Sequence, residues 1–181
     1  MRRHTVAILI GGESRRMGTP KHDIELPSGQ TMLDCTVAFA RTVSNNVVIV
    51  GGEVDGYRCI QDRRDSHGPV AGIEALLESG IDDRYLVVGC DMPRLSLEVV
   101  TPLFQQDEAA IYTNNGTVIG LPFLVLSSAL NVCTEYLDEG KRSIKGFVKI
   151  IPHTEISVCD EIAALLQSVN TLDDLHKFAV E

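Results

Sequence analysis

The segment LIGGESRRMGTPK, residues 9–21, carries the strongest structural signal in this chain. It continues an apolar run, residues 6–10, whose length and β-branched content predict a buried strand. The glycines after that run let backbone N–H groups approach an anion closely, and Arg15, Arg16 and Lys21 supply positive charge beyond them. A strand that leads into such a loop is typical of an α/β protein that holds the phosphates of a nucleotide.

The loop differs from two common phosphate-binding signatures. It lacks the GK[ST] ending of a P-loop, and the GxGxxG spacing of a dinucleotide fingerprint is absent. The alternative interpretation is a plain glycine turn with solvated arginines. That alternative does not explain why two arginines and a lysine gather beside Gly11 and Gly12 with a single acid, Glu13.

Size and composition indicate an ordinary globular protein. The 181 residues suffice for one full-sized domain with a sizeable core, and 44% hydrophobic and 23% charged residues are usual for a soluble chain. No apolar run is long enough to span a membrane, and no charged-then-apolar leader opens the sequence. We therefore expect a cytoplasmic protein.

Charge and cysteine usage narrow the function further. A formal net charge of -9 argues against broad nucleic-acid binding, but it does not exclude a nucleotide substrate, because only the field at the loop matters there. The five cysteines are scattered and never form a CxxC pair, which fits reduced, mostly buried thiols. The histidines are equally dispersed, so no zinc site is suggested.

Strands and helices are expected to alternate along the chain. Thr31 with Asp34, and Thr171 with Asp174, have capping-box spacing, and Ser96 is a predicted N-cap for a helix that Pro102 disturbs. The expected strands are residues 6–10, 46–50, 85–88, 109–113, 123–126 and 156–159; the expected helices are 31–43, 69–77, one after 96, 129–137, 141–149 and 171–178. This alternation predicts an α/β fold with a mostly parallel sheet covered on both faces. Ligands of such sheets bind beyond the carboxyl ends of strands.

Asp91 is the second candidate for chemistry. It comes just past the predicted strand 85–88, and Pro93 prevents the chain from continuing as a regular strand. A carboxylate there is well placed to hold Mg²⁺, which proteins bind through one or two carboxylates together with phosphate oxygens. The alternative is an aspartate that caps a turn before Pro93. A phosphate loop in the same protein favours the metal.

A third candidate is Asp62, followed by the segment GPVAGI at residues 68–73. The glycines indicate a helix N-terminus with a close approach, either to a ligand or to neighbouring backbone. Arg63, Arg64 and Asp65 are predicted to form a solvated loop.

Taken together, these segments resemble the molybdenum cofactor guanylyltransferase (MobA-like) family of nucleotidyltransferases. The first segment is similar to that family's LAGGxSxRMGxxK signature. GPVAGI at 68–73, CDMPRL at 90–95, GKRSI at 140–144 and VNT at 169–171 agree in order and spacing. The resemblance covers nearly the whole chain. It implies a Rossmann-like three-layer nucleotidyltransferase fold with a mostly parallel central sheet, as one domain over residues 1–181.

The resemblance also implies an activity. That activity is transfer of GMP from Mg-GTP to the terminal phosphate of molybdopterin or Mo-molybdopterin, with release of pyrophosphate. Other proteins of molybdenum cofactor biosynthesis, or acceptor proteins, would be partners, and no nucleic acid or membrane is implied. In this resemblance Arg16, Lys21 and Asp91 are catalytic and Asp91 holds Mg²⁺. The residues implied for GTP are Leu9, Ile10, Gly11, Gly12, Lys21, Asp62 and Asp91, with Asn170 toward the pterin.

Two other functions stay open on the sequence alone. One is a related nucleotidyltransferase of the same fold, either a molybdopterin cytidylyltransferase or an enzyme that uses a sugar or alcohol phosphate. The Gly11-Gly12 pair and GPVAGI favour guanine over cytosine. The other is a non-catalytic GTP-binding adaptor, against which the presence of Arg16, Lys21 and Asp91 argues.

Overall fold

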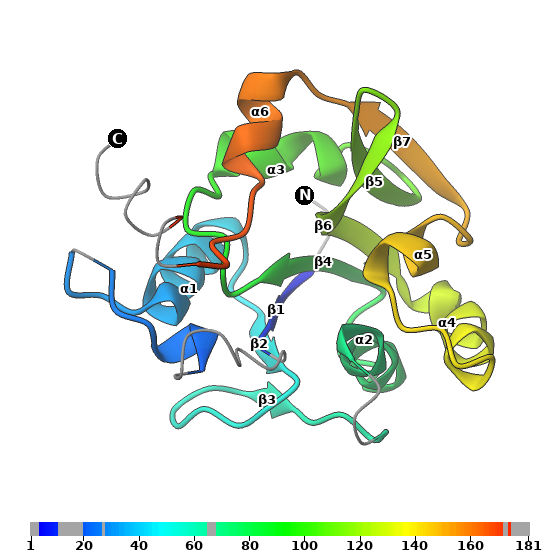
Figure 1. The fold of residues 1–181 in the computed structure, drawn as a ribbon. Coiled ribbons are helices and arrows are strands. Elements are labelled where there is room, and N and C mark those ends of the chain that lie inside the picture. Colours follow the sequence, from blue (N-terminus) through cyan, green and yellow to red (C-terminus); the bar gives the residue numbers. More distant parts are fainter. Residues whose placement is uncertain (1–3, 11–19, 27, 65–67, 172–173, 175–181) are drawn as a thin grey trace.

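A seven-stranded sheet forms the centre of the computed structural model, which describes residues 4–10, 20–26, 28–64, 68–171 and 174 (Figure 1). Its strand order is β3-β2-β1-β4-β6-β5-β7. The strands are β1 (Thr5–Leu9), β2 (Val47–Val50), β3 (Cys59–Ile60), β4 (Arg84–Gly89), β5 (Ala109–Asn114), β6 (Thr117–Leu126) and β7 (His153–Ser157). All neighbouring pairs are parallel except those that β6 makes with β4 and β5, so the predicted mostly parallel sheet is confirmed.

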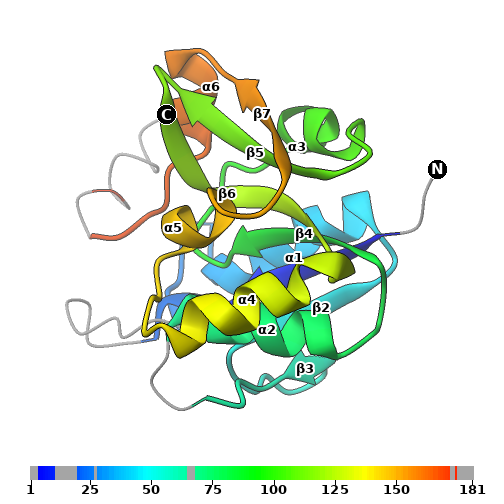
Figure 2. The same ribbon diagram turned by 90° about the vertical axis from the view of Figure 1, so that its right-hand side faces the viewer.

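Helices cover both faces of this sheet, as the three-layer prediction requires (Figures 1 and 2). One face carries α1 (Met32–Val43), α3 (Leu97–Phe104) and α6 (Asp160–Leu165). The opposite face carries α2 (Pro69–Glu78), α4 (Leu130–Asp138) and α5 (Ile144–Val148). Short 3₁₀ turns span Lys21–Asp23 (η1) and Ser127–Ala129 (η2). Within the described ranges, no helix has the length and apolar character needed to cross a membrane.

Strand β1 shows why the first apolar run is continuous. All five of its residues are buried. Val6 and Ile8 pack into the core under α1 and α3, while Ala7 and Leu9 pack into the core under α2. Because successive side chains of a strand point to opposite faces, a strand covered on both sides favours consecutive apolar residues. The one polar residue of β1, Thr5, is buried with its hydroxyl bonded to Asp82 Oδ2 at 3.1 Å.

Helix ends follow the predicted caps. At α1 the amide of Asp34 donates to Thr31 Oγ1 at 3.0 Å, and the amide of Thr31 donates to Asp34 Oδ2 at 3.0 Å. Thr171 and Asp174 make the same reciprocal pair of bonds, at 3.0 and 3.1 Å. The helix expected from 171 to 178 otherwise lies outside the described residues. Ser96 caps α3, whose regular run includes Pro102.

The β5–β6 hairpin was missed in part. Its turn is Asn115-Gly116, with φ of 48° and 72°. Asn-Gly is the favoured pair for a two-residue hairpin turn with positive φ at both positions. The prediction of a strand over residues 123–126 therefore recovered less than half of β6, although the turn signal stood in the sequence.

Four other elements differ from the predictions. Helix α6, residues 160–165, was not predicted, and neither was the two-residue strand β3. The helix predicted over 141–149 begins only after the N-cap Ser143, whose hydroxyl accepts a bond from the amide of Gly146. The last strand spans 153–157 rather than 156–159, because it pairs residue by residue with β5.

The prediction that residues 63–65 form a solvated loop was wrong for the side chain of Arg64. Its guanidinium makes two bonds to the carboxylate of Glu74, at 2.7 and 2.8 Å, and a third to Asp138 at 2.5 Å. Glu74 is buried, so Arg64 neutralises a carboxylate inside the α2–α4 packing. Arg63 is exposed and pairs with Glu78, and Asp65 lies outside the described residues.

The five cysteines are all free thiols, but they are less buried than expected. Cys90 and Cys133 are buried, Cys35 and Cys59 are half-buried, and Cys159 is exposed.

Candidate functional site

The parallel strands bring several predicted site residues to one edge of the sheet. Strand β1 lies between β2 and β4 and runs parallel to both, with Leu9 opposite Val50 and Gly89. The carboxyl ends of these three strands therefore lie side by side at one edge of the sheet (Figure 1). This carboxyl edge is the place where ligands of doubly covered parallel sheets bind.

Three separate segments hold the backbone on either side of Asp91. The amide of Cys90 donates to the carbonyl of Leu9 at 3.0 Å, and Thr36 Oγ1 of α1 lies 3.1 Å from the carbonyl oxygen of Cys90. The carbonyl of Asp91 itself accepts a 2.8 Å bond from the amide of Val169. Burial raises the pKa of the Cys90 thiol to about 12, so this cysteine stays protonated and is a packing residue.

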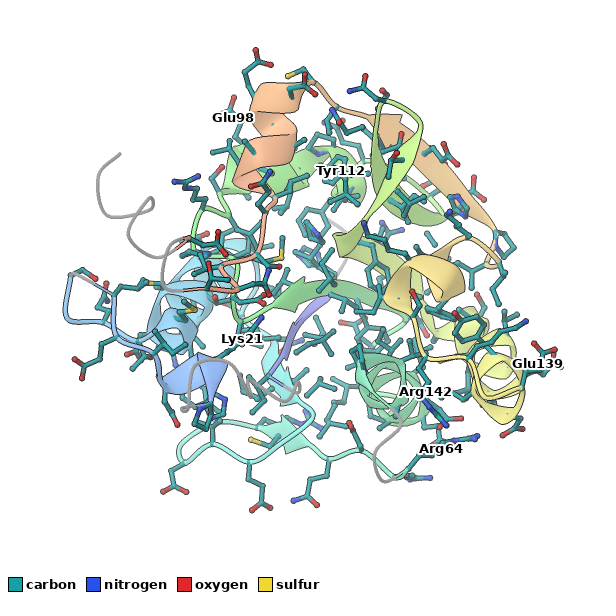
Figure 3. All side chains as sticks on the ribbon, in the orientation of Figure 1. Lys21, Arg64, Glu98, Tyr112, Glu139 and Arg142 are labelled. Atoms are coloured by element: carbon teal, nitrogen blue, oxygen red, sulfur yellow. The ribbon has the colours of Figure 1, made fainter. Side chains whose placement is uncertain are left out.

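Lys21 joins the Asp91 loop to the C-terminal segment. Its Nζ lies 2.7 Å from Asp91 Oδ2 and 2.5 Å from Asn170 Oδ1. The Lys21 and Asp91 side chains are only 22% and 14% exposed, so this ion pair is largely screened from solvent. Figure 3 labels Lys21 beside the end of β1. The structure thus brings together three residues that are far apart in the sequence and that the resemblance singled out.

The other oxygen of Asp91 rests against Gly89. A Cβ atom built on Gly89 would lie 2.5 Å from Asp91 Oδ1, a distance that real Cβ contacts do not reach. The last residue of β4 therefore has to be glycine for the carboxylate to fold back over the strand end. This arrangement keeps one carboxylate oxygen at the carboxyl edge while the other binds Lys21.

The Asp91 carboxylate could hold a magnesium ion that takes its other ligands from water and a bound nucleotide. No group of three or more His, Cys, Asp or Glu side chains with metal-site geometry occurs in the described part of the chain. Mg²⁺ does not require one, since it is commonly held by one or two carboxylates and takes its remaining ligands from water and substrate phosphates. Asp91 is a carboxylate of that kind. Its Oδ1 lies in the space that a side chain at Gly89 would fill, which we call the Gly89 cradle.

Asp62 lies at a second place along the same edge, just past β3. A Cβ on Gly72, in the second turn of α2, would lie 3.0 Å from Asp62 Oδ1 and 2.8 Å from Val50 Cγ1. The close approach predicted from the glycines of residues 68–73 is therefore an approach to neighbouring side chains. Partial burial against α2 raises the pKa of Asp62.

Leu9 is the last residue of β1 and Ile10 follows it, and both side chains lie in the core. Leu9 packs on the α2 face and Ile10 on the α1 face, and the tip of Ile10 occupies the space above Gly52, where a Cβ would lie 2.9 Å from Ile10 Cδ1. Contact of these residues with a nucleotide would therefore be made largely by main-chain atoms. The other predicted members of the phosphate loop, Gly11, Gly12, Arg15 and Arg16, lie outside the described residues.

Sequence reasoning missed a groove that adjoins this site. The groove has a volume of about 600 Å³ and lies between β6, α5 and the C-terminal end of α6. Its lining includes Leu121, whose Cδ1 lies 3.4 Å from the position of a Gly89 Cβ, so the groove begins beside the Asp91 cradle. The GKRSI segment was the signal that could have located it, since Ser143 and Ile144 form part of its wall.

Known proteins share this sequence pattern over nearly its full length. A protein named probable molybdenum cofactor guanylyltransferase from Carboxydothermus hydrogenoformans is 28% identical over 190 residues, covering 98% of this chain and 95% of that protein. A molybdenum cofactor guanylyltransferase from Shewanella putrefaciens is 25% identical over 186 residues, covering 96% and 95% of the two chains.

Solved structures show the same fold. The crystal structure of molybdopterin-guanine dinucleotide biosynthesis protein A from Archaeoglobus fulgidus superposes with a TM-score of 0.80 at 22% identity, covering 96% of this chain and 95% of that one. The 2-C-methyl-D-erythritol 4-phosphate cytidylyltransferase from Thermus thermophilus has a TM-score of 0.72 at 17% identity, covering 99% and 98%.

The family assignment rests on most of the chain. The family described as the MobA-like NTP transferase domain matches residues 6–154, a range that includes Lys21, Asp62 and Asp91. Its first matched residues form the strand that leads into the glycine loop, and its later ones include the Gly89–Asp91 cradle and the α5 wall of the groove. This chain belongs to the MobA-like NTP transferase domain family and is a nucleotidyltransferase.

Proposed function

We propose that the protein is a molybdenum cofactor guanylyltransferase, which transfers GMP from Mg-GTP to the terminal phosphate of molybdopterin or Mo-molybdopterin. The observation that carries this proposal is the Lys21–Asp91 pair at the carboxyl edge of the sheet, with an open groove beside it. The names of the similar proteins supply the nucleotide and the acceptor. We further propose that residues 1–181 form one domain, and that it works in the cytoplasm with other proteins of cofactor biosynthesis.

The proposed chemistry needs no side-chain nucleophile. An oxygen of the acceptor phosphate, already an anion at neutral pH, attacks the α-phosphorus of GTP, and the bond from that phosphorus to the β-phosphate oxygen breaks. The products are the guanine dinucleotide form of the cofactor and pyrophosphate. Catalysis then consists of aligning the two substrates and stabilising the charge that moves onto the leaving group.

Asp91 would hold Mg²⁺, which supplies charge neutralisation at the nucleotide phosphates when it is bound. Lys21 has the position and charge to stabilise the departing pyrophosphate, because its ammonium already lies at the strand end that the phosphates would reach. We assign the same task to Arg16, and nucleotide binding to Leu9, Ile10, Gly11 and Gly12. In this proposal Asp62 binds the nucleoside, and Asn170 lies on the side where the acceptor binds.

Pyrophosphate release tests the proposal directly. Purified protein is incubated with Mg²⁺, molybdopterin and either GTP or CTP, and the Asp91→Asn variant serves as the inactive control. We expect release with GTP, little with CTP, and a loss of at least about a hundredfold in the variant. Release with CTP in place of GTP would indicate the cytidylyl relative. Binding of Mg-GTP without release in the presence of molybdopterin would indicate the adaptor.

A further inference from the structure

The groove beside Asp91 carries one charged side chain among the residues that line it, Lys145. The remaining lining is apolar or uncharged, and it includes Asn114, Ser143 and Gln167. A single cation in a groove of about 600 Å³ is notable in a chain with a net charge of -9. It makes the groove locally attractive to an anion.

The position of Lys145 is fixed by its contact with β6. Lys145 is the second residue of α5, and its aliphatic stem crosses Gly120, where a Cβ would lie 3.1 Å from Lys145 Cγ and 3.7 Å from Lys145 Cε. The next residue after Gly120 is Leu121, which reaches the Gly89 cradle. Lys145 thus contacts β6 one residue before Leu121, the lining residue that reaches Gly89 at the Asp91 end of the sheet.

The ammonium group of Lys145 is available for a ligand. No ion pair between described residues engages it, in contrast to Lys141, which pairs with Glu139. Among the uncharged groups, Asn114 is already used at the rim, because its Nδ2 donates to the carbonyl of Val158 at 3.1 Å and to Asp160 Oδ1 at 2.9 Å. Ser143 accepts a bond from a backbone amide, which leaves its own hydroxyl hydrogen free to donate toward the groove.

We propose that Lys145 binds the terminal phosphate of the acceptor and sets the preference of the groove for a phosphate monoester. The proposal rests on the proposed function for the identity of the acceptor, but its cation and its groove do not depend on which nucleotide is used. Ser143 would add a neutral donor to the same phosphate. The nucleotide site at Lys21 and Asp91 is left unchanged by this assignment.

Kinetics separate an acceptor contact from a structural role. Lys145→Met keeps the stem that crosses Gly120 and removes the charge, Lys145→Arg keeps the charge, and Lys149→Met is the matched control at the C-terminal end of the same helix. We expect Lys145→Met to raise the KM for molybdopterin by about tenfold to a hundredfold, the loss typical of a charge-assisted hydrogen bond. The KM for GTP should not change, Lys145→Arg should recover most of the affinity, and Lys149→Met should match the wild type.

A footprint gives a second readout that needs no turnover. The rates at which acetylating reagent modifies Lys145 and Lys149 are followed by mass spectrometry with molybdopterin alone and with Mg-GTP alone. We expect molybdopterin to slow the modification of Lys145 and not of Lys149. Protection by Mg-GTP alone, or an unchanged KM for molybdopterin in Lys145→Met, would overturn the proposal. If the wild type releases no pyrophosphate, the proposed function fails, and the footprint alone decides the role of the groove.

Discussion

Replacing Gly89 by alanine tests whether Asp91 needs the position in which the structure holds it. Gly89 ends β4 and its backbone φ is not positive, so alanine is compatible with the local conformation. The new methyl group, however, would lie 2.5 Å from Asp91 Oδ1. Its contacts with Leu121 and Met92, at 3.4 and 3.6 Å, are ordinary. The substitution therefore acts on the carboxylate and leaves the strand in place.

The size of the displacement sets the expected effect. Real Cβ contacts begin near 3.0 Å and become ordinary beyond 3.4 Å, so the Asp91 carboxylate has to move by between about half an ångström and one ångström. A misplacement of about 1 Å in a catalytic group can cost a hundredfold in rate. We expect Gly89→Ala to lower kcat by about tenfold to a hundredfold, or roughly 1.4–2.7 kcal/mol of transition-state stabilisation.

The assay is steady-state pyrophosphate release with Mg-GTP and molybdopterin, accompanied by thermal unfolding. Gly89→Ala, Asp91→Asn and the double variant form a double-mutant cycle. If the methyl group acts by displacing the carboxylate, the double variant should be no slower than Asp91→Asn, because the carboxylate is already gone. The unfolding temperature of Gly89→Ala should stay close to that of the wild type.

Three results would refute the reasoning. A wild-type kcat in Gly89→Ala would show that the position of Asp91 is not critical. Additive losses in the double variant would show that the methyl group acts on something other than Asp91. A large fall in the unfolding temperature would likewise mean that the strand, and not the carboxylate, responds to the change.

Three further predictions concern stability and reactivity. Arg64→Met should lower the unfolding temperature by several degrees more than Arg63→Met, because it leaves its buried glutamate partner without a counter-charge, and calorimetry on both variants decides the point. Burial raises the pKa of Asp62 above 3.8, so the unfolded chain releases this proton first and stability falls as pH rises through that range. Asp62→Asn should therefore unfold at a higher temperature than the wild type at pH 7, with the gap closing toward about pH 4; an unchanged gap would contradict this. A thiol reagent should label Cys159 in the folded protein and Cys90 only after unfolding, as read by mass spectrometry.

Much of the fold was predictable from local patterns. The strand that became β1 was evident because both of its faces are buried, and the residues after Thr5 form an uninterrupted apolar run, residues 6–10. The start of α1 followed from Thr31 and Asp34, whose capping bonds are local in sequence. Helix α6 was missed because it is only six residues long and none of its residues is fully buried; it meets the core through half-buried residues such as Ile162 and Leu165. A weak apolar pattern of that length does not distinguish a helix from a loop.

The candidate site was predictable as separate residues and not as an assembly. Asp91 could be placed at a strand end from the apolar run before it and the proline after it. Its contact with Lys21 and Asn170 depends on the order of the strands and on a bond between Val169 and the Asp91 carbonyl, which no local pattern encodes. The groove is a tertiary feature in the same sense. Its walls come from β6, α5 and α6; the first two were predicted with wrong bounds and the third was missed.

The carboxylates of Asp91 and Asp62, both at the carboxyl edge of the sheet, each lie close to a glycine. Asp91 Oδ1 lies close to Gly89, and Asp62 Oδ1 lies close to Gly72. Each carboxylate oxygen occupies space that a side chain at the glycine position would need. In one case the glycine is two residues before the acid, and in the other it lies ten residues beyond it on a helix. Glycine at these positions serves close approach, because neither has a positive φ. Glycine at these two positions therefore lets an acidic side chain lie close to the backbone of β4 or α2, a role that no turn explains.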